Sequence, residues 1–200
     1  MPRIATFALA AVLMVTLASQ ALACACCAST GERMDLAMPL NAGHVEELQR
    51  LRFEKAAQLF LGEADPDSVK GIATPSARYD LDAAWRDNQF VFAFRDDKGR
   101  AGTLALQRPA TIGIFHTDLR QEPEGGLGPA LYKEWRLTAK ANGAGVFAPG
   151  LGAQQLLTLV LQGRGNNCSG AGDFTHWMLV MRGPKAKYHL FGDLAAEGKP

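Results

Sequence analysis

The stretch QFVFAFRDDKGRAGTLALQ, residues 89–107, decides the fold class of this 200-residue chain. Every second residue from Phe90 to Phe94 is a phenylalanine, and Leu104 and Leu106 supply a matching apolar face after the polar turn. Side chains of a β-strand alternate between its two faces, so this pattern predicts two half-buried strands. Gly99 can adopt the positive φ that a tight turn needs, so we expect the two strands to form a β-hairpin.

On both sides of this hairpin, short apolar segments bounded by turn residues predict further strands. Glycine-rich segments separate several of them and are expected to be loops. The pattern indicates an all-β fold, either an antiparallel sandwich or a small barrel of about seven to nine strands. Besides an apolar stretch that begins at Leu59, the expected strands are 69–74, 111–116, 134–141, 155–162, 175–181 and 187–191, and the expected loops are 121–129, 142–152 and 163–172.

One short N-terminal helix is expected at residues 41–52. Asn41 can cap the helix, and Val45, Leu48 and Leu51 follow at helical spacing. No other segment after the signal peptide carries a comparable helical pattern, so the helix is expected to be an addition to a β domain.

Residues 1–23 read as a cleavable signal peptide. Arg3 gives a positive start, residues 4–17 are apolar, and Ala21-Leu22-Ala23 has the small-x-small pattern that signal peptidase requires. The apolar run is shorter than the roughly 20 residues of a membrane helix, so cleavage would leave no transmembrane helix. The chain is therefore expected to begin at Cys24 and to be exported to the periplasm or envelope of a bacterium, or secreted. Cys24 also stands where a lipoprotein carries its acyl chains, so a lipidated, membrane-anchored form is an alternative.

After the signal peptide, residues 24–40 are expected to form an irregular, cysteine-bearing arm and residues 41–200 a single antiparallel β domain. About 177 residues are enough for one hydrophobic core. The sequence has 21 Lys and Arg against 20 Asp and Glu, and Arg3 belongs to the signal peptide, so the exported chain is formally neutral. A neutral chain without a basic run lacks the surface that binds nucleic acid.

The four cysteines are the most informative residues after the signal peptide. Three lie together at positions 24, 26 and 27, and Cys168 lies in a distant loop. In an oxidising compartment, Cys26 or Cys27 is expected to form a disulfide with Cys168 and to tie the arm to the domain. The disulfide candidates are therefore Cys26, Cys27 and Cys168, while Cys24 is the lipidation candidate.

A soft-metal site is the alternative interpretation of the same cysteines. Closely spaced thiolates suit copper(I) or zinc, and a histidine could complete the set. The cysteine spacing matches no zinc-finger pattern, so no cofactor is expected unless copper or zinc binds here. The candidate ligands are Cys24, Cys26, Cys27, Cys168 and His176.

A third interpretation makes Cys168 a nucleophile activated by His176, with Asp173 between them. The string Asn167-Cys168-Ser169-Gly170 resembles the start of the NlpC-type cell-wall cysteine peptidases. In that family the cysteine opens a helix and the histidine lies much farther along the chain. Here Gly170-Ala171-Gly172 follows and His176 comes soon after, so the activity is not carried over and no catalytic residue is assigned.

The aromatic residues could in principle line a barrel for an apolar ligand, but their alternation is typical of a plain core. They are Trp85, Trp135 and Trp177, together with the phenylalanines from Phe90 to Phe94. The sequence shows no convergent set of acid, base and nucleophile. We therefore expect a non-catalytic binding or accessory domain that binds an unknown small ligand or envelope component, with a metal-binding protein and a thiol-dependent enzyme as alternatives.

Overall fold

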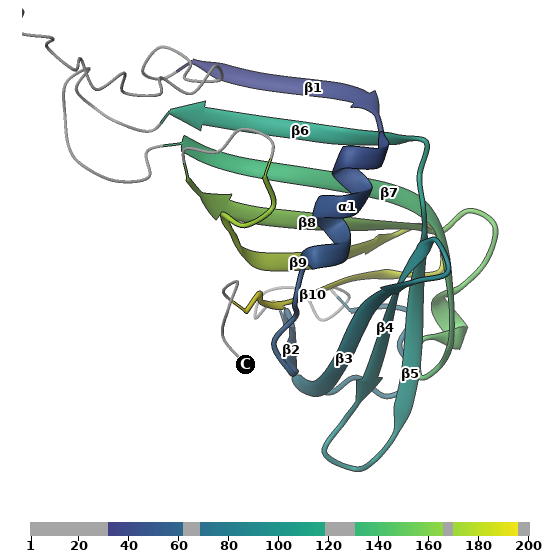
Figure 1. The fold of residues 1–200 in the computed structure, drawn as a ribbon. Coiled ribbons are helices and arrows are strands. Elements are labelled where there is room, and N and C mark those ends of the chain that lie inside the picture. The colour runs from purple at the N-terminus through teal and green to yellow at the C-terminus, as the bar shows by residue number, and fades with distance from the viewer. Residues whose placement is uncertain (1–31, 62–68, 119–130, 166–169, 196–200) are drawn as a thin grey trace, which may run out of the picture.

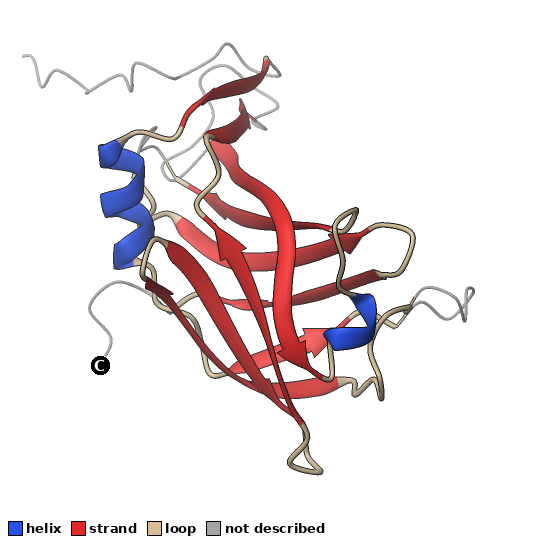
Figure 2. Cartoon of the chain, turned by 90° about the vertical axis from the view of Figure 1, so that its right-hand side faces the viewer, coloured by secondary structure: helices blue, strands red, loops and turns tan. Residues whose placement is uncertain are grey.

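The computed structural model describes residues 32–61, 69–118, 131–165 and 170–195, and within them the chain is all-β, as the sequence predicts. The structure describes a ten-stranded antiparallel sheet and one α-helix (Figures 1 and 2). The strands are β1 (Arg33–Pro39), β2 (Ala56–Leu59), β3 (Arg78–Arg86), β4 (Gln89–Arg95), β5 (Ala101–Gln107), β6 (Thr111–Asp118), β7 (Leu131–Gly145), β8 (Leu156–Arg164), β9 (Phe174–Arg182) and β10 (Lys187–Asp193). The helix is α1 (Ala42–Arg50), and a 3-10 turn, η2 (Ala148–Gly150), follows β7.

The sheet closes into an eight-stranded barrel. The strand order is β1-β6-β7-β5-β4-β3-β2-β10-β9-β8, and β8 also pairs with β7. β7 is 15 residues long, and β5 and β6 pair with successive stretches of one of its edges. Residues 131–136 pair with β6, and residues 141–145 pair with β5. The barrel closes through β5, while β6 and β1 form a two-stranded extension at the other half of β7.

The hairpin that the sequence predicts at residues 89–107 is confirmed. All seven residues of β4 pair with β5, from Gln89 with Gln107 to Arg95 with Ala101. Gly99 has a φ of 77° in the connecting turn. β3 precedes this hairpin and joins β4 through Asp87 and Asn88, which both have positive φ, as a tight two-residue hairpin turn requires.

Aromatic and leucine side chains fill the interior of the barrel. Phe90, Phe92 and Phe94 are almost fully buried, and Trp177 lies 6.1 Å from Phe92 between ring centroids. The interpretation of these aromatics as core is therefore confirmed. Trp135 is also buried, whereas Trp85 is half-buried and packs against Phe90.

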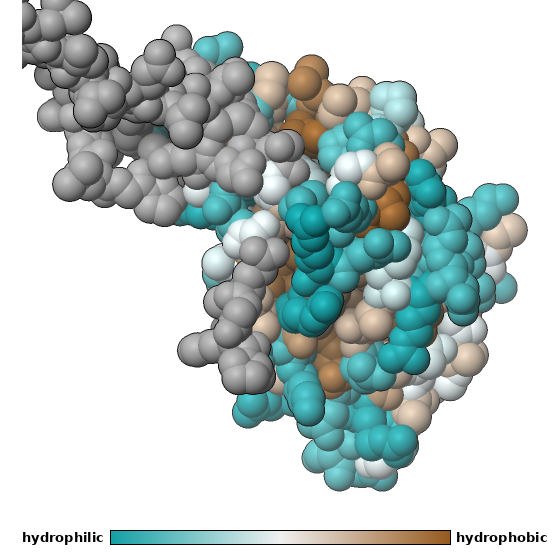
Figure 3. All heavy atoms as spheres, viewed as in Figure 1, coloured by the Kyte–Doolittle hydropathy of each residue, from teal (hydrophilic) through white to brown (hydrophobic). Residues whose placement is uncertain are grey.

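α1 connects β1 to β2 and lies over β6 to β9 in the view of Figure 1. The Asn41 side chain accepts a hydrogen bond from the backbone N–H of His44 at 3.0 Å, which confirms the expected N-cap. His44 and Leu48 are buried, and the His44 ring meets the edge of Trp135. The opposite face of the helix is hydrophilic (Figure 3).

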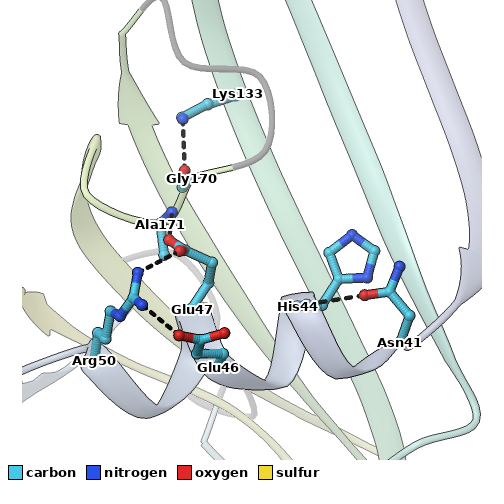
Figure 4. Close-up of polar contacts among 8 residues, drawn as sticks. All are labelled: Asn41, His44, Glu46, Glu47, Arg50, Lys133, Gly170 and Ala171. Atoms are coloured by element: carbon cyan, nitrogen blue, oxygen red, sulfur yellow. Dashed lines mark hydrogen bonds and ion pairs between the residues drawn. The ribbon is translucent and has the colours of Figure 1, made fainter.

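A hydrogen bond from α1 also holds the start of the segment that leads to β9. The Glu47 carboxylate accepts a bond from the N–H of Ala171 at 2.8 Å, and the Lys133 ammonium donates to the carbonyl of Gly170 at 2.8 Å (Figure 4). Residues 170–171 are therefore held between α1 and β7.

Three expectations about local structure were wrong. Residues 33–39 are not irregular but form the strand β1, which pairs with β6 along its whole length. Met34, Leu36 and Met38 lie on one face of this strand, and the residues between them lie on the other. Residues 69–74 do not form a strand. The backbone of Lys70 hydrogen-bonds to Lys187, whereas that of Ala73 hydrogen-bonds to Val146, so the segment does not pair continuously with one neighbouring strand. β3 was not expected, and β7 extends four residues into the segment 142–152 that was expected to be a loop.

The expected signal peptide and the cysteine-bearing residues 24–31 lie outside the described residues, as do 62–68, 119–130, 166–169 and 196–200. In the part of the chain that the structure describes, no helix is long and apolar enough to cross a membrane.

Candidate binding site

A groove of about 460 Å³ lies on the outside of the barrel wall, where β3, β4, β5 and the end of β7 run side by side. Its outward-facing residues come from all four strands: Asp80, Asp82, Ala93, Arg95, Thr103 and Ala144.

The register of the sheet explains why the wall is hollow here. Asp82 pairs with Ala93, Ala93 with Thr103, and Thr103 with Ala144, so these four residues form one row across the strands. Three of the four side chains are small, and they leave space above the sheet. The neighbouring inward residues, such as Phe94 and Leu104, are large and buried. The same strands therefore carry large side chains on the inner face of the wall and small ones on its outer face.

The rim of the groove carries charge. Asp80 lies directly opposite Arg95 in the register, yet no ion pair between them occurs in the described structure. Asp82 pairs with Arg86 at 3.3 Å on an exposed surface, where such a contact contributes little to stability. Two carboxylates and one guanidinium therefore border an otherwise apolar hollow. Asp82 shares its charge with Arg86, and Arg95 Nη1 donates a hydrogen bond to the carbonyl of Gly99 at 3.2 Å.

Among the described residues, aromatic and leucine side chains fill the interior of the barrel. Two buried polar atoms there, Tyr188 Oη and Trp177 Nε1, have no hydrogen-bond partner among the described residues. Burial raises the pKa of Tyr188, so its hydroxyl stays neutral. These atoms are isolated in the core and do not converge on a cavity.

A second polar feature lies on the outer face of β7, near its start. The Glu134 carboxylate accepts hydrogen bonds from Tyr132, from Arg136 Nη2 at 2.6 Å and from Gln162 Nε2 at 3.2 Å. Burial raises the pKa of Glu134, but the bonds from Tyr132 and Arg136 and the charge of Arg136 outweigh it, so the pKa lies below its ordinary value. Arg136 also stacks over Phe115 and reaches Asp35. Because these polar groups bond to one another, few of their hydrogen-bonding positions remain for a ligand.

On the inner face, Lys133 is 2% exposed and its ammonium contacts Asp173 Oδ2 at 2.8 Å. The ammonium also lies 5.2 Å from the centre of the Phe174 ring. This is a structural contact that ties β7 to the start of β9.

The residues singled out from the sequence do not form a site in the described structure. Cys24, Cys26, Cys27 and Cys168 all lie outside the described residues, so their pairing, lipidation and metal binding stay predictions. His176 is on the outer face of β9 with a 63% exposed side chain, and its Nε2 lies 3.4 Å from Asp193. Asp173 pairs with Lys133 instead. In the described ranges, no three His, Cys, Asp or Glu residues are grouped so that they could hold a metal ion.

The other histidines are also dispersed. His44 is on the buried face of α1, and burial lowers its pKa. His116 is buried on β6, where burial lowers its pKa although the charge of Glu32 opposes the shift. His189 faces outward beside Phe60. Each has a local packing environment, and none approaches the groove.

The fold and the groove define a class: a closed eight-stranded antiparallel barrel with a packed interior, a two-stranded side extension and a hollow on its outer wall. Comparisons with protein-family models, with curated proteins and with solved structures found no match to this chain. Sequence reasoning missed the groove, because it depends on which alanines the register places side by side.

Proposed function

We propose that this protein is a non-catalytic binding domain of the bacterial cell envelope that binds its ligand in the groove outside β3, β4 and β5. One observation carries the proposal: large side chains fill the inside of this wall, whereas small ones leave a volume of about 460 Å³ outside it. Ligand sites are usually apolar hollows of this size with a few polar groups at the rim.

The rim indicates the chemistry of the ligand. Asp82 already pairs with Arg86, whereas Asp80 makes no ion pair among the described residues. The floor is made of Ala93, Thr103 and Ala144. A ligand with an apolar body and a basic group would bury the body on the floor and place its positive charge near the two carboxylates. An acidic ligand of the same shape would meet repulsion from them.

A titration with two small probes tests this proposal. We expect 2-phenylethylamine to bind with a Kd of about 1 mM, a normal value for so small a molecule, and 3-phenylpropanoate to bind much more weakly. Nuclear magnetic resonance would report the site, because amide signals of β3, β4 and β5 would shift during the titration.

Two tryptophan variants provide the matched control. Ala93→Trp fills the groove from a half-buried, outward-facing position, whereas Ala153→Trp places the same residue in an exposed turn that is not part of the groove lining. The amine should lose binding to the first variant and keep it with the second. Equal binding to both variants, or no shift with either probe in the unsubstituted protein, would contradict the proposal.

The export part of the proposal has a separate test. The full chain, expressed in a bacterium and recovered from the periplasm, should have a mass that begins at Cys24, with two hydrogens lost for each disulfide. An added lipid mass would make the protein an anchored lipoprotein, and the retained first 23 residues would contradict cleavage.

A further inference from the structure

Among the described residues, β1 is the free edge of a sheet that is otherwise closed. The barrel strands pair on both sides, whereas β1 pairs only with β6 in the described structure. Exposed edges attract other strands, and proteins usually protect them with charges, prolines or a covering segment. Within the described residues, no element covers the outer side of β1.

The side chains of β1 make this edge apolar on one face. Met34, Leu36 and Met38 lie on the same face because strand residues alternate, and Leu36 is 47% exposed. The surface at the end of the molecule where β1 lies shows apolar atoms (Figure 3). On the other face, Asp35 is held by Arg136 of the same chain at 3.4 Å.

The free backbone groups of β1 are those of its odd-numbered residues. The N–H of Leu40 donates to the carbonyl of Ala110 at 3.0 Å, so the even-numbered residues face β6. Arg33, Asp35 and Ala37 therefore direct their N–H and C=O groups away from the sheet. Pro39, which has no N–H to donate, also falls on this outer side, where proline is tolerated.

We propose that the protein forms a two-fold symmetric dimer in which β1 pairs antiparallel with β1 of a second copy. The sequence of β1 is complementary to a second, antiparallel copy of itself. With Leu36 opposite Leu36 of the other copy, all seven residues lie opposite a partner residue, and Met34 meets Met38 on the same apolar face. At each end of the ladder one bond is missing, because Pro39 has no N–H to donate to Arg33. Asp35 and Ala37 then lie opposite each other, and their outward backbone groups form the ladder.

Charge selects this register over its neighbour. A shift of two residues toward the N-terminus would place Asp35 opposite Asp35, and like charges directly opposite in a ladder are destabilising. A shift the other way would leave Arg33 and Met34 unpaired. The register centred on Leu36 avoids both penalties. This inference does not depend on the proposed function, because the groove is lined by β3, β4, β5 and β7.

Two seven-residue strands bury a small area, so the dimer is expected to be weak, with a Kd in the micromolar to millimolar range. Sedimentation equilibrium of the full expressed chain should therefore show a monomer–dimer equilibrium. Leu36 faces its own copy at the two-fold axis, so Leu36→Lys places two like charges directly opposite each other and should raise the Kd at least about tenfold. Leu156→Lys is the matched control, because Leu156 is 48% exposed on β8, which is paired on both sides. A monomer at all concentrations, or a dimer that Leu36→Lys and Leu156→Lys affect equally, would overturn the proposal.

A cross-link tests the register itself. Residues in a non-hydrogen-bonded antiparallel pair have Cα atoms about 4.5 Å apart, which a disulfide can span. Leu36→Cys should therefore link to its own copy, and tryptic digestion should release two copies of the peptide Met34–Arg50 joined together, which native cysteines cannot produce. Ala37→Cys, on the opposite face and opposite Asp35, should not link to itself. Equal linking by both variants, or none by Leu36→Cys in a protein that dimerises, would overturn the register.

Discussion

The two parts of β7 belong to one continuous strand, but the first carries large and charged side chains and the second carries mostly small ones. The first half, up to Lys140, presents Lys133 inward and Glu134 outward, and each has named partners within the chain. The second half, residues 141–145, has the sequence Ala-Asn-Gly-Ala-Gly and lines the end of the groove. The first half therefore uses its side chains for internal contacts, while the second leaves the wall open.

This difference also shows how the barrel closes. Where β6 pairs with the first half, a Cβ added at Gly113 would lie 3.5 Å from the Cβ of Arg136, which is an ordinary contact. Where β5 pairs with the second half, a Cβ added at Gly143 would lie 2.1 Å from the carbonyl oxygen of Thr103, so the backbone would have to shift to admit it. Small residues in the second half therefore allow closure and, on the outer face, leave the groove empty.

The largest predicted effect comes from filling that close approach. Gly143→Ala should lower the free energy of unfolding by about 3 kcal/mol, because the clash is with backbone that cannot turn away. Gly113→Ala, the matched change beside the first half of β7, should cost less than about 1 kcal/mol, since its new methyl group meets only ordinary contacts. Urea denaturation would measure both. Equal costs would mean that the backbone around Gly143 shifts to admit a methyl group as easily as the space beside Gly113 accepts one.

Much of the fold could be predicted from the sequence because alternation and capping are local signals. The hairpin at residues 89–107 and the helix that begins after Asn41 agree with the structure. The alternation of Tyr79, Leu81 and Ala83 could have revealed β3 by the same rule. Barrel closure could not be deduced in this way, because it requires β5 and β6 to pair with different stretches of one edge of β7, which no local pattern encodes.

The candidate site could not be predicted from the sequence. Ala93, Thr103 and Ala144 are unremarkable one by one, and they form a floor only through a register that joins three strands. The sequence instead drew attention to cysteines and histidines. Of these, the structure describes the histidines alone and finds them dispersed over the described surface and core.

In the first half of β7, stability should depend on the ion pair between Lys133 and Asp173 rather than on the volume of a side chain. Asp173→Ala should lower the free energy of unfolding by about 2 kcal/mol, because it removes a carboxylate that pairs with a lysine 2% exposed. The cost is below that of a fully buried pair, since Asp173 is 27% exposed. Lys133→Met should cost less, because an apolar side chain then fills the buried position and the carboxylate can reach water. If the lysine variant were the less stable one, packing of its stem, rather than its charge, would dominate this contact.

The smallest predicted effect concerns Glu134 on the outer face, and it depends on pH. The native state holds the pKa of Glu134 below its ordinary value, so its charged form is stabilised by folding. That contribution is fully present above the pKa of the unfolded chain and is lost as the pH falls through the lowered native pKa. Glu134→Gln should therefore lower the free energy of unfolding by about 1 kcal/mol at neutral pH, after allowance for screening at the surface.

In acid, the unsubstituted protein and Glu134→Gln should converge in stability, because protonation removes the same charge that the substitution removes. Denaturant titrations between pH 7 and pH 3 would follow this convergence, and Thr158→Val, which removes a hydroxyl contact to Thr138 on the same face but no charge, is a control whose cost should not vary with pH. A constant difference between the unsubstituted protein and Glu134→Gln over this range would mean that the hydrogen bonds to Glu134 matter and its charge does not. On the outer face, the first half of β7 would then be stabilised by hydrogen bonds and packing without a contribution from the charge of Glu134.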